Sequence, residues 1–192
     1  MIINSLLIFF SLVVTAAILV PRDWRWTLFG LAMTYLFGFI LIVQIWPLPL
    51  AAVKLLTGLI GVILLSTTKM NTEVQEEPIG SISSRIFILL LAILSWIIVL
   101  ATISRLNAWL PIEYTNLFIG MVFLICGIIK FSTDQRIFNV IVGLLTLLSG
   151  FDIIYSSLEG SALVTALYAL IVISICILGS YLEGIFSGEG EE

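Results

Sequence analysis

The segment PLPLAAVKLLTGLIGVILLSTTK, Pro47–Lys69, is almost entirely apolar, yet it carries a lysine, Lys54, close to its start. A helix that crosses the hydrocarbon core of a bilayer needs about 20 mostly apolar residues. Leu48–Thr67 meets this requirement, so we predict a membrane-spanning helix here. Lys54 would lie roughly 8 Å along that helix from Pro49. At this depth a lysine can extend to the headgroups or meet a carboxylate at its own level.

The composition of the whole chain agrees with this prediction. Of its 192 residues, 61% are hydrophobic and 10% are charged, and the mean hydropathy is +1.25. Soluble domains are roughly 45–50% apolar and about 25% charged. We therefore expect an all-α, multi-pass integral membrane protein of the cell inner membrane, with the lipid bilayer as its main surroundings.

Seven segments are predicted to span the membrane: Ile2–Val20, Trp26–Ile45, Leu48–Thr67, Ile86–Ile103, Ile112–Ile129, Ile137–Tyr155 and Ser161–Leu182. The first lacks a basic leader and an A-x-A-like cleavage site, which favours a retained helix over a signal peptide. The fifth is short and begins beside Glu113. The last two come from one apolar run that is too long for a single span, and we place the break in SSLEGS, Ser156–Ser161, where Gly160 permits a turn.

The positions of Lys and Arg in the short loops predict the orientation. With seven spans, one face collects Arg22, Arg25, Lys69, Arg85, Lys130 and Arg136, and the other has Arg105, with Lys54 if it reaches that surface. We therefore expect the N-terminus outside and the C-terminus in the cytoplasm. If the fifth segment did not span, Lys130 and Arg136 would change sides and the bias would weaken.

The predicted chain is a single membrane domain with four parts. Residues 1–67 form a three-helix segment, 68–85 a cytoplasmic polar loop, 86–184 a four-helix segment, and 185–192 an acidic cytoplasmic tail. The loop is either a solvated linker or a docking surface for a soluble partner. At an offset of 62, Leu48-Pro49-Leu50 aligns with Leu110-Pro111-Ile112, which is either a chance similarity or a sign of two parallel helical hairpins.

Small residues predict where the helices touch, because helices in lipid associate largely through close packing at such positions. The candidates are Gly120, Gly127, Gly143, Gly150, Ala162, Ala166 and Ala169. They predict a tight cluster of the fifth, sixth and seventh helices. Aromatic residues at predicted helix boundaries are typical of an interfacial belt, namely Trp24, Trp26, Trp46, Trp109 and Tyr114.

Three ionisable residues fall in or beside the predicted membrane segments: Lys54, Asp152 and Glu159. Charged groups at membrane depth are costly, which makes them candidate functional residues. One interpretation is structural: Lys54 extends to the headgroups, Asp152 bonds Ser156 or Tyr155, and Glu159 sits before the seventh helix. The others are a Lys–carboxylate pair that fixes helix packing, with either Asp152 or Glu159, and a site that handles protons or ions.

Other kinds of chemistry find no support in the sequence. The chain has no histidine, and its two cysteines, Cys126 and Cys176, sit in apolar runs without metal-ligand spacing. We expect no metal, no haem and no other cofactor, no nucleic-acid partner, and no enzymatic activity beyond that of a non-redox subunit in a translocating oxidoreductase. Because polar helix residues are few and scattered, we expect the chain to work beside other membrane subunits.

The stretch GFDIIYSSLEGSALVTALYALIVISICILGSYL, Gly150–Leu182, resembles the ends of small polytopic subunits in complex I-like assemblies. These are the E-type subunit of hydrogenase-4, the K-type subunit of NADH-quinone oxidoreductase and the C-type subunit of multisubunit cation/proton antiporters. The hairpin PLPLAAVKLLTGLIGVIL is similar in character, and the resemblance covers about a third of the chain. Those families place a glutamate well inside a helix, whereas Glu159 lies at a predicted turn.

The sequence therefore predicts a small accessory subunit of an ion- or proton-translocating complex, with helix packing as its main work and a possible Lys–carboxylate relay. Two alternatives stay open at this point. One is a free-standing small-solute transporter, and the other is a structural or assembly protein of the membrane without transport activity.

Overall fold

The protein is described by a computed structural model that covers residues 2–20, 23–71, 82–133 and 136–188. Within these ranges the chain forms seven α-helices: α1 (Ile2–Leu19), α2 (Trp24–Ile42), α3 (Leu48–Asn71), α4 (Ile82–Trp109), α5 (Tyr114–Thr133), α6 (Ile137–Leu158) and α7 (Ala162–Gly188). The all-α fold class and the seven predicted helical segments are confirmed. The break predicted at Ser156–Ser161 is also confirmed, since α6 ends at Leu158 and α7 begins at Ala162.

Six of these helices, α2 to α7, are long and apolar enough to cross a membrane. The fifth helix, which looks short in the sequence, is one of them. In α1 the described apolar stretch is shorter, Leu6–Leu19, although the whole helix of 18 residues is about 27 Å long at 1.5 Å per residue.

The polar loop is shorter than predicted, because helix continues into it from both sides. The sequence pattern places the loop at residues 68–85, but α3 runs on to Asn71 and α4 begins at Ile82. Polar side chains are compatible with a helix outside the hydrocarbon. Both helices therefore extend beyond their apolar segments. The remaining part of the predicted loop, residues 72–81, and the acidic tail from residue 189 lie outside the described residues.

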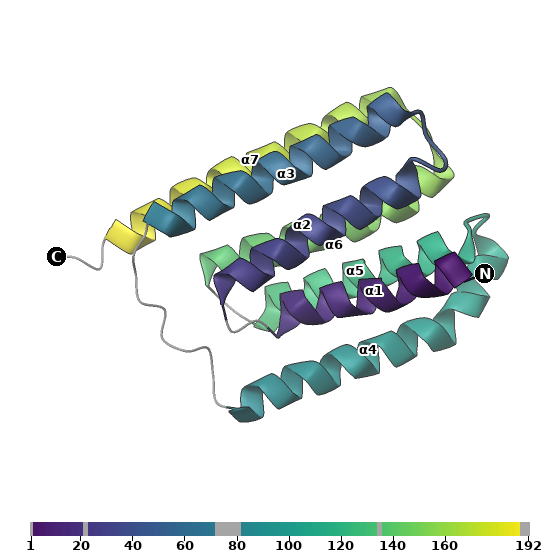
Figure 1. Cartoon of the computed structure of the whole chain (residues 1–192), viewed down its shortest axis with the longest axis horizontal. Coiled ribbons are helices and arrows are strands. Elements are labelled where there is room, and N and C mark those ends of the chain that lie inside the picture. The colour runs from purple at the N-terminus through teal and green to yellow at the C-terminus, as the bar shows by residue number, and fades with distance from the viewer. Residues whose placement is uncertain (1, 21–22, 72–81, 134–135, 189–192) are drawn as a thin grey trace.

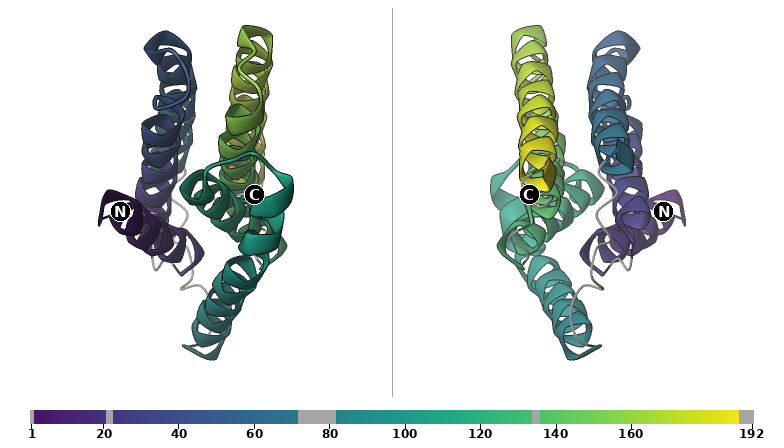
Figure 2. Two further views of the ribbon diagram at one scale, coloured as in Figure 1. Left: turned by 90° about the vertical axis from the view of Figure 1, so that its right-hand side faces the viewer. Right: turned by 90° about the vertical axis from the view of Figure 1, so that its left-hand side faces the viewer.

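The helices lie side by side and the chain reverses direction at each connection (Figure 1). One layer holds α3, α2 and α1 in that order, and the other holds α7, α6, α5 and α4. The layers meet as three pairs, α3 with α7, α2 with α6, and α1 with α5, as the end views show (Figure 2). In each pair the two helices run the same way, and α4 connects one three-helix unit to the other at the edge of the bundle.

A few residues also coincide between the two three-helix units at a spacing of 112 residues, although most positions differ. Thr34, Gly38 and Phe39 of α2 match Thr146, Gly150 and Phe151 of α6, and Asn4 matches Asn116. Thr34 and Thr146 are both buried, and each donates a hydrogen bond to the carbonyl four residues earlier in its own helix. The offset of 62 relates the second and third helices to the fourth and fifth, whereas the structure pairs α1, α2 and α3 with α5, α6 and α7. The paired units are therefore three helices long rather than two.

Four glycines bring α5 and α6 into backbone contact. A Cβ atom on Gly127 would clash with the backbone of Leu147, and one on Gly150 would clash with the backbone of Leu124. Gly143 faces the backbone of Phe131 in the same way, and Gly120 faces Ile154 and the Gly150 carbonyl. The predicted close packing of these glycines is therefore present, but it joins two helices rather than three.

The prediction for α7 is wrong in its residues, and α6, one of its predicted partners, is a lesser neighbour of α7 rather than the main one. Ala162 and Ala166 are exposed and Ala169 is partly exposed, so these alanines do not line a contact with α5 or α6. The main neighbour of α7 is α3, where Gly61 leaves room for the Cys176 sulfur, and its Gly179 lies against Ile141 of α6. The reason is geometric: α6 already presents its glycine face to α5, and α7 has to cover a different one.

A Gly127→Ala variant tests the α5–α6 contact. The added methyl would push against backbone rather than against a flexible side chain, so we expect a loss of about 1–3 kcal/mol of stability. The matched control is Gly184→Ala on α7, where a Cβ meets nothing within 4 Å. It should leave stability unchanged or raise it by up to about 1 kcal/mol through helix propensity. Thermal unfolding in detergent measures both, and equal midpoints for the two variants would contradict the contact.

Candidate functional site

Lys54 and Asp152 lie at the same depth because the fold sets their helices in register. Lys54 is six residues after the start of α3 at Leu48, and Asp152 is six residues before the end of α6 at Leu158. Since α3 and α6 run in opposite directions, these two helix ends meet at the same end of the bundle (Figure 1). Each residue is therefore about 9 Å inside its helix end, measured from the same side.

The two side chains form a buried ion pair. The Lys54 Nζ lies 2.6 Å from Asp152 Oδ1, and the residues are only 4% and 6% exposed. The ammonium also donates a hydrogen bond to Ser156 Oγ at 2.8 Å. Ser156 Oγ in turn donates to the Asp152 backbone carbonyl at 2.5 Å, one helical turn earlier. The three side chains thus form one connected polar cluster between α3 and α6.

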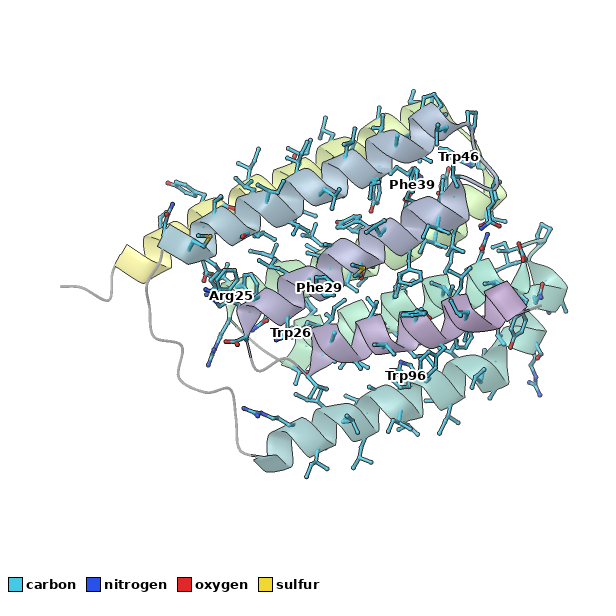
Figure 3. The ribbon with its side chains drawn as sticks, viewed as in Figure 1. Arg25, Trp26, Phe29, Phe39, Trp46 and Trp96 are labelled. Carbon is cyan, nitrogen blue, oxygen red and sulfur yellow. The ribbon has the colours of Figure 1, made fainter. Side chains whose placement is uncertain are left out.

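Aromatic rings cover the ammonium where the carboxylate does not. The Trp46 ring centroid lies 4.3 Å from Lys54 Nζ, and the Tyr168 ring centroid lies 5.6 Å away. Cations are attracted to the faces of aromatic rings at such distances, most strongly where water is excluded. Trp46 is held in place by its own hydrogen bond, from Nε1 to the Ser156 carbonyl at 2.8 Å. Figure 3 shows Trp46 at the connection between α2 and α3.

The geometry selects among the interpretations that the sequence left open. Lys54 does not extend to the headgroups but turns inward to Asp152, and its carboxylate partner is not Glu159. Glu159 is exposed just beyond α6 and accepts a hydrogen bond of 2.9 Å from the Tyr155 hydroxyl. The bond expected between the Asp152 side chain and Ser156 is present as a long contact, with Ser156 Oγ 3.4 Å from Asp152 Oδ1. Of the three candidate residues, the structure brings two together and leaves the third at the surface.

Trp46 and Tyr168 belong to this site although the sequence does not single them out for it. The sequence pattern assigns Trp46 to the interfacial belt, yet it is only 5% exposed. Trp26 and Trp109 are 61% and 88% exposed, as belt residues should be. Trp46 contacts a lysine that lies more than one helical turn into the next helix. Such a contact leaves no periodic pattern in the sequence, so only the folded structure shows it.

The pair lies just beneath the surface of one end of the bundle. A hollow of about 290 Å³ opens there between the α2–α3 and α6–α7 connections. Trp46 and Ser156, which contact Lys54, both line it, together with Glu159 and Gly160. A single layer of side chains therefore separates the ion pair from this hollow.

The chemistry available at the site is that of one carboxylate, one ammonium and the hydroxyl and rings around them. Across the described residues, no three His, Cys, Asp or Glu side chains come close enough to hold a metal ion. A buried carboxylate of this kind can be neutralised either by its lysine or by a proton.

The fold and its six long apolar helices place this chain among the multi-pass α-helical membrane proteins, with an ion pair buried between its two three-helix units. No protein-family model, curated protein or solved structure matches the chain.

A double-mutant cycle at Lys54 and Asp152 tests the ion pair. Lys54→Met or Asp152→Leu alone should cost about 3–5 kcal/mol of stability, because each leaves the other group buried without its partner. The double variant should recover most of that loss, since two apolar side chains replace both charges. Unfolding of the four proteins in detergent gives the coupling energy. Additive effects would mean that the two groups do not act as a pair.

Proposed function

We propose that this chain is a small membrane subunit of an ion- or proton-translocating complex, and that Lys54 and Asp152 form its charge relay. The observation that carries the proposal is the ion pair buried between α3 and α6 at 2.6 Å. Ionisable groups held inside a membrane protein are a functional hypothesis by default, because a purely apolar contact would be less costly.

The relay would work by exchange of partners on Asp152. In one state the carboxylate is neutralised by the Lys54 ammonium. In the other, a proton binds Asp152, and the ammonium is held by the Ser156 hydroxyl and the Trp46 ring, which already contact it. The two states differ in where the positive charge lies, which is what couples proton binding to movement of α3 against α6.

The resemblance of Gly150–Leu182 and of Pro47–Leu64 to small subunits of complex I-like assemblies supports the subunit assignment, although Pro47–Leu64 belongs to the single helix α3 and is not a hairpin. A free-standing transporter is the second candidate, and one feature of the fold favours it. The two parallel three-helix units meet across the charged residues, and parallel repeats around a central site are a recurring plan among transporters.

The orientation belongs to the same proposal, with the N-terminus outside and the C-terminus in the cytoplasm. The C-terminal ends of α1, α3 and α5 fall at one end of the bundle (Figure 1), and most of the lysine and arginine lies at or near these ends in the sequence. The Lys54–Asp152 pair lies near the opposite end, which would be the outer one.

Ion flux in proteoliposomes and in native membranes tests the relay. We expect Lys54→Met and Asp152→Asn each to reduce proton or cation translocation at least tenfold, because either change removes the partner exchange. Glu159→Gln is the matched control: it neutralises a carboxylate at the same end of α6 that contacts Tyr155 rather than Lys54, and should leave translocation unchanged.

The two candidate functions, subunit and free-standing transporter, differ in the preparation in which ion flux is expected. Flux only in membranes that hold the assembled complex, with co-purification of other subunits in mild detergent, supports the subunit. Flux from the purified chain alone supports the free-standing transporter. Translocation unchanged in both charge variants would contradict the relay and leave the pair a role in helix packing.

Reporter fusions test the orientation. A C-terminal fluorescent-protein fusion should fluoresce and a C-terminal alkaline phosphatase fusion should be inactive, because the first folds in the cytoplasm and the second outside it. The reverse pattern would overturn the proposed topology.

A further inference from the structure

Another hollow, of about 380 Å³, opens between α2 and α3 near the end of the bundle opposite the Lys54–Asp152 pair. Two rows of side chains spaced four residues apart form its walls: Trp24, Leu28 and Ala32 on α2, and Val62, Ser66 and Met70 on α3. Residues four apart lie on one face of a helix, so each row is about 12 Å long. We call the hollow between these two rows the α2–α3 groove.

The α2–α3 groove is apolar along most of its length and opens on the outer surface of the bundle. Leu28 is buried in its inner wall, whereas Phe29 and Met70, which also line it, are exposed. The length of about 12 Å is close to the roughly 15 Å of hydrocarbon in one leaflet, half of a bilayer core of about 30 Å. The groove therefore has the depth and the lining that suit an acyl chain.

An arginine lies at the end of this groove where α2 begins. Arg25 belongs to the first turn of α2, lines the groove and is exposed. Its guanidinium carbon lies 5.5 Å from the centroid of the Trp24 ring, a distance at which a cation is attracted to an aromatic face. Figure 3 shows Arg25 at this end of α2, close to the exposed Trp26. Exposed tryptophans of this kind mark the headgroup level of a membrane, so Arg25 lies at that level.

The charge of Arg25 is not neutralised by an acid in the described part of the chain. No carboxylate lines the groove there, and none forms a salt bridge with the guanidinium. The nearby Lys69 of α3 turns instead to α7, where its Nζ lies 2.6 Å from Glu183 Oε1. The Trp24 indole and the Ser66 hydroxyl, which also line the groove, can both donate hydrogen bonds. This end of the groove therefore favours an anion.

We propose that the α2–α3 groove binds one anionic phospholipid, with its phosphate at Arg25 and one acyl chain between the two rows of side chains. A guanidinium matches a phosphate group in geometry and charge, because its fork of N–H groups can donate two parallel hydrogen bonds. In the proposed orientation this end of the bundle is the cytoplasmic one. Basic pockets between membrane helices on that side are typical sites for anionic headgroups.

The combination of one cation and an apolar groove distinguishes a lipid from other occupants. Inorganic phosphate would pair with Arg25 but would leave the 12 Å of apolar lining without a partner. An apolar helix of another subunit would cover the lining but would leave the guanidinium without an anion. A phospholipid with a net negative charge satisfies both parts of the site.

Native mass spectrometry of the full chain in mild detergent measures this binding. Phosphatidylglycerol is the anionic probe, and phosphatidylcholine with the same acyl chains is the zwitterionic comparison. We expect one phosphatidylglycerol to bind about fivefold more tightly than phosphatidylcholine, which corresponds to about 1 kcal/mol for one arginine near an anionic headgroup. It should also raise the unfolding temperature, because it binds the folded bundle. Equal affinities for the two lipids would overturn the proposal.

Arg25→Gln tests the headgroup contact. It should weaken phosphatidylglycerol binding about fivefold and leave phosphatidylcholine binding unchanged, and Arg25→Lys should keep part of the preference because it keeps the charge. The matched control is Arg105→Gln, since Arg105 is an exposed arginine near the end of α4 and does not line the groove. A loss of preference that is equal in Arg25→Gln and Arg105→Gln would mean that net charge alone attracts the lipid.

Ala32→Phe tests the acyl-chain contact without changing a charge. The added ring fills the inner end of the groove, so phosphatidylglycerol binding should weaken at least fivefold. The matched control is Ala166→Phe at an exposed position of α7, which should leave binding unchanged. Binding that survives Ala32→Phe, or inorganic phosphate at millimolar concentration that raises the unfolding temperature as much as the lipid does, would overturn a lipid as the occupant. All these readouts are independent of ion flux, so they test the groove separately from the charge relay.

Discussion

The organisation of this protein depends on one constraint: a charged ammonium and a charged carboxylate buried in the bundle are far less costly together than apart. Lys54 and Asp152 are far apart in the sequence and belong to different three-helix units, and their contact joins α3 to α6. A buried ion pair of this kind adds little net stability, because desolvation offsets most of the attraction, but it strongly disfavours arrangements in which either charge is alone. It therefore sets the register of the two helices more than the strength of the fold.

Close backbone packing supplies much of the stabilisation that the ion pair does not. Water is absent from the bilayer core, so there is little hydrophobic drive for helices to associate, and contacts at small residues take its place. The glycines of α5 and α6 create such a contact, which fixes the second three-helix unit. On α3, the space beside Gly58 is filled instead by Tyr35 of α2, and the space beside Gly61 by Cys176 of α7. This packing places a hydroxyl and a thiol in the interior of the bundle.

The pairing of like helices gives the bundle two related halves with different contents. Thr34 and Gly38 of α2 correspond to Thr146 and Gly150 of α6, but Asp152 on α6 corresponds to Ile40 on α2. The two units thus share an arrangement of helices but not the residues of the ion pair. Lysines on α3 face acids on α6 and α7, so the Lys54–Asp152 and Lys69–Glu183 pairs both lie on the side of the bundle away from α4.

The sequence by itself determined the class of the protein, the seven helices and the glycines that join α5 to α6, because apolar length and small-residue spacing are local properties of a helix. It also marked Lys54 and Asp152, since charges within apolar segments stand out, and their depths were readable from the rise of a helix. What only the tertiary structure decided was which helix each one faces. Helix rotation and neighbour choice set the partner of Lys54, the covering of α3 by α7, and the burial of Trp46 and Tyr35. Those contacts join residues with no fixed spacing along the chain, so no periodicity records them.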